Sequence, residues 1–206
     1  MRLVVATRSK DKMSEIRKIL ADVPDLEILD LDEAAVDYRP EEEALEPHDS
    51  FEENAASKAT YFFEKTGIPT VADDSGLEVD ALDGAPGVRT KRFAPGAGLE
   101  GEARDQANNA HLLLLLEGRP PEERGARYVC VAALATGSGE IRSFRGEAPG
   151  RVLTDPRGAG GFGYDPVILD ESSGRSFAEL SPEEKNERSH RGRAFRALGD
   201  FLKGRE

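Results

Sequence analysis

Two adjacent carboxylates and a hydroxyl form the stretch of the sequence that is best suited to chemistry. Asp73, Asp74 and Ser75 follow a short apolar run, and Gly76 comes directly after them. Successive residues of a strand point to opposite faces, so one carboxylate would face a site and the other would brace the backbone. Carboxylate oxygens beside a turn suit Mg²⁺, which one or two carboxylates usually hold together with substrate phosphates. The alternative is a polar strand end that a tight glycine turn closes.

The N-terminal segment offers a candidate anion site. Residues 2–7 form a short apolar, β-branched run that predicts a buried strand. Ser9 occupies an N-cap position, and Asp11 falls in the first turn of the helix that follows. The free N–H groups of a helix N-terminus attract anions, and here Thr7 and Ser9 add hydroxyls while Lys12 adds a cation. An ordinary capped helix explains the same residues without a ligand.

A second helix is predicted to begin after Ser50 and to run to about Lys65. Ser50 and Glu53 have the spacing of a capping box, and Gly67 supplies the C-cap. A polar line along one face of this helix consists of Asn54, Lys58 and Tyr61. Lys58 is either a phosphate-binding cation or a surface lysine whose stem covers apolar area.

A glycine-rich stretch with two aromatic residues spans residues 158–166. Glycines let the backbone approach a ligand closely, and the rings of Phe162 and Tyr164 could stack on a flat base. Asp165 could accept hydrogen bonds from ring N–H groups. The alternative is a glycine loop with two core aromatics.

Cationic side chains follow near the C-terminus. Ser181 caps a predicted helix that carries Lys185, and His190 and Arg191 precede a final amphipathic helix. Arg can hold a planar acceptor through two N–H groups, and His can act as donor or acceptor. Isolated surface residues are the alternative.

The remaining pattern predicts alternating strands and helices. Strands are expected at residues 26–29, 127–135, 140–146 and 150–153, and a further helix at residues 102–117. His111 on that helix is interpreted as structural. Cys130 is interpreted as a small buried hydrophobe of its strand.

Composition excludes several classes of protein. The chain has 206 residues, a net charge of -12 and one cysteine. The negative charge argues against a protein that coats a nucleic acid polymer, and a single cysteine excludes an internal disulfide framework. No apolar run reaches the length of a membrane span, and the N-terminus lacks the pattern of a signal peptide, so we expect a cytoplasmic protein with no membrane partner.

Separated motifs extend over nearly the whole chain. They are Ala6-Thr7 with Lys12 and Glu15; Ser50-Phe51-Glu52-Glu53-Asn54-Ala55 with Lys58-Ala59; Ala72-Asp73-Asp74-Ser75-Gly76-Leu77; Gly84-Ala85-Pro86-Gly87; Gly160-Gly161-Phe162-Gly163-Tyr164-Asp165-Pro166; and Glu184-Lys185 with Ser189-His190-Arg191. In this order they resemble the inosine triphosphate pyrophosphatase family. Their combination favours a ligand-binding interpretation over the structural alternatives.

The resemblance implies an elongated α/β fold in which two lobes share a long central mixed sheet, with the nucleotide in a cleft between the lobes. Residues 1–206 would form one such domain. Family members are typically homodimers that need Mg²⁺ and cleave abnormal purine nucleoside triphosphates (ITP, dITP and XTP) to the monophosphate and pyrophosphate. The alternatives are a pyrophosphatase for other modified nucleotides and a nucleotide-binding sensor without turnover.

The resemblance also implies roles for single residues. Asp74 matches the proton acceptor and a metal ligand, and Glu46 matches the second metal ligand. The substrate-binding positions are Thr7, Arg8, Ser9, Lys10, Asp11, Lys12, Lys58, Ser75, Phe162, Gly163, Tyr164, Asp165, Lys185, His190 and Arg191. Family members commonly carry Asn in place of Ser9 and Gly in place of His48. The second departure leaves Glu42, Glu43 and Asp49 as alternatives to Glu46.

Overall fold

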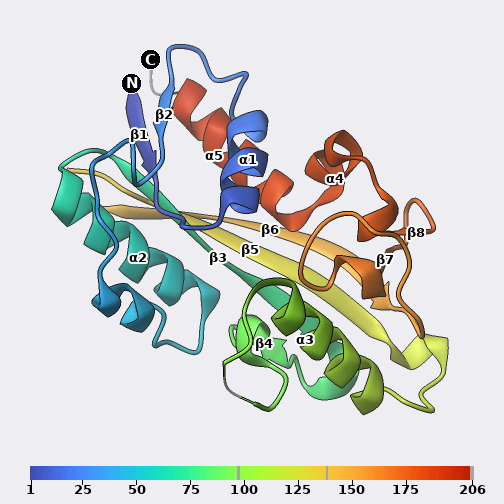
Figure 1. Ribbon diagram of the computed structural model, residues 1–206. Helices are drawn as coiled ribbons and strands as arrows, with labels where there is room; N and C mark the ends of the chain where they lie inside the picture. The colour runs from blue at the N-terminus through green and yellow to red at the C-terminus, as the bar shows by residue number, and fades with distance from the viewer. Residues whose placement is uncertain (97, 138, 205–206) are drawn as a thin grey trace. The chain divides into compact units, whose positions relative to one another are not determined.

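The computed structural model describes residues 1–96, 98–137 and 139–204. Within these residues the helices are α1 (Lys10–Ile19), α2 (Phe51–Thr66), α3 (Gly101–Leu115), α4 (Pro182–Arg188) and α5 (His190–Lys203) (Figure 1). The strands are β1 (Arg2–Val5), β2 (Glu27–Leu29), β3 (Thr70–Val79), β4 (Pro86–Gly87), β5 (Gly125–Ala135), β6 (Ile141–Val152), β7 (Ile168–Asp170) and β8 (Arg175–Ser176). No helix within the described residues is both long and apolar enough to span a bilayer.

In the described part of the chain, eight strands form one mixed sheet. The order is β2-β1-β3-β5-β6-β7-β8, with β4 paired to β3. β1 pairs in parallel with β2 and with β3, and Val4 lies opposite both Leu29 and Thr70. Parallel neighbours need a crossover connection, which α1 and α2 supply here. β7 pairs antiparallel with β6 and β8. The predicted α/β fold with a long central mixed sheet is confirmed.

The chain divides into two compact units, and the first comprises Met1–Asp74, Cys130–Gly146 and His190–Glu206. In this unit α1 and α5 pack together over one face of the strands, and Figure 1 shows α2 on the other face. Gly146 allows the close approach of β6 and α5, since a Cβ at this position would lie 2.2 Å from the carbonyl oxygen of His190.

The second unit comprises Ser75–Val129 and Glu147–Ser189. Its core joins Leu112 of α3 to Tyr128 of β5 and to the aromatic ring of Phe177. His111 packs its ring against Phe93 at 5.0 Å, in agreement with a structural role. The expectations that residues 1–206 act as one domain and that a nucleotide lies between its lobes stay predictions.

Two strands are longer than the sequence pattern predicted. β3 continues through both carboxylates and Gly76, which rules out the alternative of a strand end that a glycine turn closes. Leu77 and Glu78 are held in the strand by pairing with β4, and this pairing overrides the turn preference of the glycine. The segments expected as separate strands at 140–146 and 150–153 form the single strand β6. The other predicted elements end within two residues of their expected bounds.

Candidate active site

The two adjacent carboxylates of β3 face different helices, as the alternation of a strand requires. Asp73 is 2% exposed, and its Oδ2 accepts a hydrogen bond from Nζ of Lys12 at 2.8 Å. Nη2 of Arg191 lies 3.6 Å from the same oxygen. Burial alone would raise the pKa of Asp73, but the charges of Lys12 and Arg191 outweigh it and hold this pKa well below its usual range. Asp73 is therefore ionised, and its ion pairs with Lys12 and Arg191 connect β3 to α1 and α5.

Asp74 faces α2, where Asn54 holds it. Nδ2 of Asn54, a residue only 1% exposed, donates to Oδ2 of Asp74 at 3.0 Å. The same amide donates to the carbonyl oxygen of His48 at 3.1 Å and accepts from its N–H at 2.9 Å. Asn54 thus joins the strand that carries Asp74 to the segment that follows Glu46. Asn54 is not among the residues for which the resemblance implies a role, although its spacing of four from Lys58 is a signal that both share one helix face.

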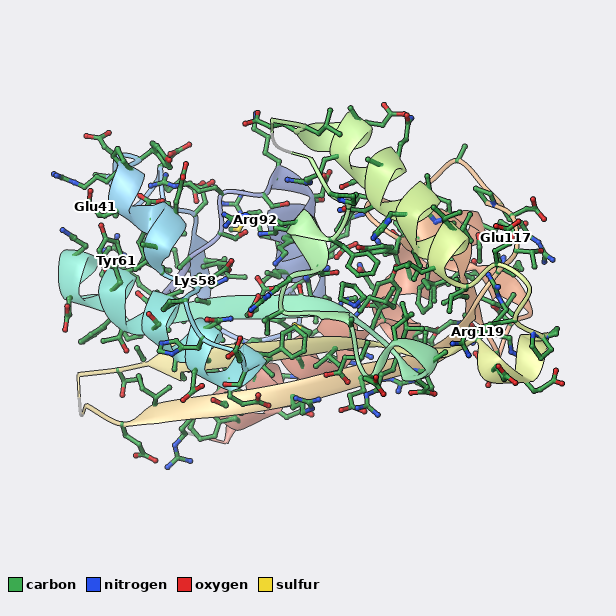
Figure 2. All side chains as sticks on the ribbon, turned by 90° about the horizontal axis from the view of Figure 1, so that it is seen from below. Glu41, Lys58, Tyr61, Arg92, Glu117 and Arg119 are labelled. Atoms are coloured by element: carbon green, nitrogen blue, oxygen red, sulfur yellow. The ribbon has the colours of Figure 1, made fainter. Side chains whose placement is uncertain are left out.

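Lys58 lies on α2 (Figure 2), and its ammonium group contacts two acidic residues of the same unit. Its Nζ lies 2.5 Å from Oε1 of Glu46 and also donates to the backbone carbonyl oxygen of Asp73. Burial alone would lower the pKa of Lys58, but the carboxylates of Glu46, Asp73 and Asp74 raise it. The ammonium group is therefore a permanent positive charge beside two candidate metal ligands.

The carboxylates of Asp74 and Glu46 fit a divalent cation by their chemistry. Burial raises the pKa of Asp74, and the negative charge of Glu46 raises it further, whereas Lys58 and Asn54 lower it. A divalent cation relieves the repulsion between two neighbouring carboxylates. Among the described residues no group of three or more His, Cys, Asp or Glu side chains is arranged around a common metal position. A pair of carboxylates suits Mg²⁺, which takes its remaining ligands from phosphates and water.

Two of the alternatives to Glu46 have other partners. Arg8 forms a bidentate ion pair with Glu42, in which Nε lies 3.0 Å from Oε2 and Nη2 lies 2.8 Å from Oε1. Glu43 accepts from the hydroxyl of Tyr38 at 3.1 Å. The charge of Glu46, by contrast, raises the pKa of Asp74. The geometry therefore favours Glu46 over Glu42 and Glu43.

A cavity of about 520 Å³ opens at the N-terminus of α1. Its lining includes Thr7, Arg8, Ser9 and Lys10, four of the expected substrate-binding residues. The hydroxyl of Ser9 accepts from the N–H of Lys12 at 3.3 Å, which confirms the predicted N-cap. Asp11 is an exposed residue of the first turn. The side chain of Lys12, by contrast, turns inward to Asp73, and its contact with a phosphate stays a prediction.

Arg191 lies in the first turn of α5 and is 2% exposed. Its Nη1 donates to Oε2 of Glu15 at 2.6 Å, and its Nη2 faces Asp73. Burial alone would lower the pKa of this guanidinium, but the two carboxylates raise it. His190, the first residue of α5, is buried as well. The expected contacts of both residues with a base stay predictions.

The second unit contains the glycine–aromatic loop, residues 160–166. Oδ2 of Asp165 accepts from Nζ of Lys185 at 2.7 Å and from the N–H of Phe162 at 2.9 Å, and Oδ1 accepts from the hydroxyl of Tyr128 at 3.2 Å. Nζ of Lys185 also lies 4.2 Å from the centroid of the Phe162 ring, a cation–π distance. The carboxylate of Asp165 therefore stabilises the conformation of the loop through hydrogen bonds inside the protein. This favours a structural role for the carboxylate over contact with a base.

The two aromatic residues of the loop have different surroundings. Tyr164 belongs to the core of the second unit, and its hydroxyl donates to the carbonyl oxygen of Thr90 at 2.9 Å. Phe162 is half-buried, as is Ser75 on β3. Phe162 is therefore the better candidate for stacking on a base, whereas Tyr164 fits the core interpretation.

Replacing Gly161 with Ala is expected to lower the free energy of unfolding by about 3 kcal/mol. Gly161 has φ +72°, and a Cβ there would lie 2.1 Å from Oδ2 of Asp165, so the variant adds strain and disrupts the Asp165 hydrogen bonds. Urea unfolding measures the difference. Gly163→Ala is the matched control, because Gly163 has φ +63° with nothing within 4 Å of the added carbon and should lose only about 1 kcal/mol. Equal losses in the two variants would contradict the steric explanation.

Comparisons of sequence agree with the motifs. The model of the Ham1 family matches residues 3–201. Relatives named dITP/XTP pyrophosphatase include those of Frankia alni, 46% identical over 98% of both chains, and Geobacter sulfurreducens, 48% identical over 98% of this chain and 96% of that one. The relative of the same name in Mycolicibacterium paratuberculosis is 49% identical over 95% of this chain and 93% of its own.

Comparisons of structure agree as well. The Ham1 protein of Staphylococcus aureus has a TM-score of 0.85 and 32% identity, with all of both chains covered. A HAM1 protein of Coxiella burnetii has a TM-score of 0.85 and 33% identity over 99% of both chains. The family resemblance inferred from the motifs is confirmed. Because the family model, full-length relatives and solved structures agree over nearly every residue, the chain belongs to the Ham1 family.

Proposed function

We propose that this protein is a pyrophosphatase that hydrolyses the abnormal purine nucleoside triphosphates dITP, XTP and ITP to the monophosphate and pyrophosphate. The observation that carries the proposal is the Asp74–Glu46 pair beside the cation of Lys58. It occurs in a chain that is 46% identical over nearly its full length to a relative named dITP/XTP pyrophosphatase. The intact acidic pair argues against a sensor without turnover.

Each of these side chains has a separate role in the proposed reaction. Asp74 acts as general base and accepts a proton from a water molecule that attacks the α-phosphorus. The new phosphorus–oxygen bond forms while the bond to the bridging oxygen breaks, and pyrophosphate leaves with the electron pair. Mg²⁺ held by Asp74 and Glu46 would neutralise charge on the phosphate oxygens. Lys58 and the Thr7–Lys10 loop supply further positive charge and hydrogen bonds to the phosphates.

Selectivity for the base requires donors that face a 6-oxo group. Adenine carries an amino group at that position and would leave a buried donor unpaired. His190 and Arg191 are the proposed donors, and Phe162 is the proposed stacking partner. The loop that carries Phe162 is held by Lys185 through Asp165.

Pyrophosphate release from a panel of nucleoside triphosphates tests the proposal. We expect turnover of dITP, ITP and XTP to exceed turnover of ATP by at least about 100-fold, the discrimination that an unpaired buried donor allows. Removing divalent cations with EDTA should abolish turnover, and adding Mg²⁺ should restore it. Preference for a methylated pyrimidine nucleotide would support the second candidate substrate class. Binding of dITP without pyrophosphate release would indicate a sensor.

Two further expectations rest on the family resemblance alone. We propose that the protein forms a homodimer, which light scattering after size-exclusion chromatography would measure. We also propose that it works in the cytoplasm, where it would clear the nucleotide pool.

A further inference from the structure

Two side chains of α3 hold both peptide groups of Gly163. The N–H of Gly163 donates to Oδ2 of Asp105 at 2.9 Å, and Nδ2 of Asn109 donates to the carbonyl oxygen of Gly163 at 3.0 Å. Asp105 and Asn109 are four positions apart and therefore lie on the same face of the helix, one turn from each other. One face of α3 thus forms hydrogen bonds with both the N–H and the carbonyl oxygen of a single residue of the glycine–aromatic loop.

Gly163 is a point of the loop at which the backbone has high intrinsic freedom. Gly163 has φ +63°, and glycine has more backbone freedom than any other residue. It follows Phe162 directly, so a change in the backbone at Gly163 displaces the aromatic ring that we assign to the base. No side chain of Gly163 itself can pack to hold this conformation, and the contacts of Asp105 and Asn109 replace that packing.

These contacts are made where water competes poorly. Asn109 is 9% exposed, and the side chain of Asp105 is 24% exposed. Nη2 of Arg104 lies 3.4 Å from Oδ1 of Asp105, on the oxygen that does not bind Gly163. A hydrogen bond to a carboxylate is roughly twice as strong as one between neutral groups, so the contact of Asp105 is the stronger of the two.

The rest of the loop is held from other elements of the same unit. Asp165 fixes the N–H of Phe162, and the hydroxyl of Tyr164 is bound to Thr90. Asp105 and Asn109 complete this set from α3. Neither residue is among the expected substrate-binding positions, and neither lies in a motif that carries the family resemblance.

We propose that Asp105 and Asn109 are positioning residues that fix the Gly163 peptide and thereby hold Phe162 in the orientation that binds the purine base. The proposal rests on the proposed function and deepens it. Neither residue needs to touch the nucleotide. Because the base lies away from the reacting phosphorus, an interaction that improves base binding equally in the ground state and the transition state lowers KM and leaves kcat unchanged.

Steady-state kinetics with dITP tests the proposal. Asp105→Ala is expected to raise KM about tenfold with kcat changed less than about twofold, since losing one charge-assisted hydrogen bond corresponds to roughly that factor. Asn109→Leu should raise KM by a smaller factor, about threefold to tenfold. Asp105→Asn keeps an acceptor oxygen and should recover most of the loss. Gln106→Ala, at an exposed position of the same helix, is the matched control and should leave both constants unchanged.

Inorganic tripolyphosphate separates base binding from general damage, because it has the phosphates but no base. Its inhibition constant should be the same in the wild type and in Asp105→Ala. A KM for dITP that stays unchanged in both the Asp105→Ala and Asn109→Leu variants overturns the proposal. An inhibition constant for tripolyphosphate that rises in parallel with KM also overturns it, because the effect would then not be confined to the base.

Amide hydrogen exchange measured by NMR tests the hydrogen bond between the N–H of Gly163 and Asp105 without any substrate. The N–H of Gly163 should be protected in the wild type and should exchange at least about tenfold faster in Asp105→Ala, the factor that corresponds to losing about 1.4 kcal/mol. Rapid exchange of this N–H in the wild type overturns the proposal even if no variant folds. Absence of turnover with every triphosphate in the wild type would instead refute the proposed function, and with it the role in base binding. The exchange result would still show whether Asp105 holds the Gly163 peptide.

Discussion

Replacing Asp74 with Asn is expected to lower kcat for dITP by about 1,000-fold, the middle of the range for loss of a general acid–base group. Asn has nearly the same shape but cannot accept the proton of the attacking water. Glu46, Lys58 and the Thr7–Lys10 loop are untouched, and Asn keeps one oxygen that can face the metal, so the dissociation constant for dITP with Mg²⁺, measured by calorimetry, should change by less than about tenfold. Turnover equal to that of the wild type would remove Asp74 from the mechanism.

The same variant should not lose stability. Burial raises the pKa of Asp74, so its ionised form is disfavoured in the folded protein and costs stability as the pH rises through that pKa. A neutral Asn removes this cost, and the free energy of unfolding at pH 7 should stay equal or increase. Asp22→Asn is the matched control at an exposed position of the first unit, and it should leave turnover and stability unchanged.

Replacing Arg191 with Met is expected to lower the free energy of unfolding by about 3–5 kcal/mol, the usual result of removing one partner from a buried ion pair. The guanidinium lies 2.6 Å from Glu15 and 3.6 Å from Asp73, and the variant leaves both carboxylates without its charge. Adding Glu15→Gln should restore at least about 1 kcal/mol, because a neutral Gln no longer requires the charge that Arg191 supplied, while Asp73 keeps its contact with Lys12. Urea unfolding measures each step. Arg196→Met, at an exposed position of the same helix, should change stability by less than about 0.5 kcal/mol.

The effect of Arg191 should also depend on pH in a defined direction. The pKa of Asp73 in the folded protein lies well below the value of about 3.9 in the unfolded chain, so the ion pairs contribute their full stability above that value. This contribution is lost as the pH falls from about 4 toward the folded pKa. The difference between wild type and Arg191→Met should therefore be smaller at pH 3 than at pH 7. A difference that is the same at both values would show that the loss comes from packing and not from charge.

Arg191 therefore stabilises the fold through its ion pairs, whether or not it also donates a hydrogen bond to a base. If Arg191→Ala leaves the preference for ITP over ATP intact in the fraction that remains folded, the donor for the 6-oxo group must be sought elsewhere. His190 is then the remaining candidate of the two proposed donors.

Local sequence determined the elements that depend on neighbouring residues. Ser9, Ser50 and Gly67 cap helices in the structure as their types and spacing predicted, because caps are satisfied by backbone groups within four residues. The order of the motifs was sufficient to predict the family and the α/β class. The local pattern did not show that Gly76 lies within a strand, because the strand is extended by the pairing of β3 with β4, which lies outside the range of a turn preference.

Only the tertiary structure decided which polar groups face each other. Lys12 and Asp73 are 61 positions apart, and Arg191 and Glu15 are 176 apart, so no local spacing shows that they pair. The same holds for Asn54 with Asp74, and for Asp105 with Gly163. The sequence by itself determined which side chains were available for this chemistry. Their pairing followed from long-range packing, because a buried charge is stable only where the fold brings it a partner.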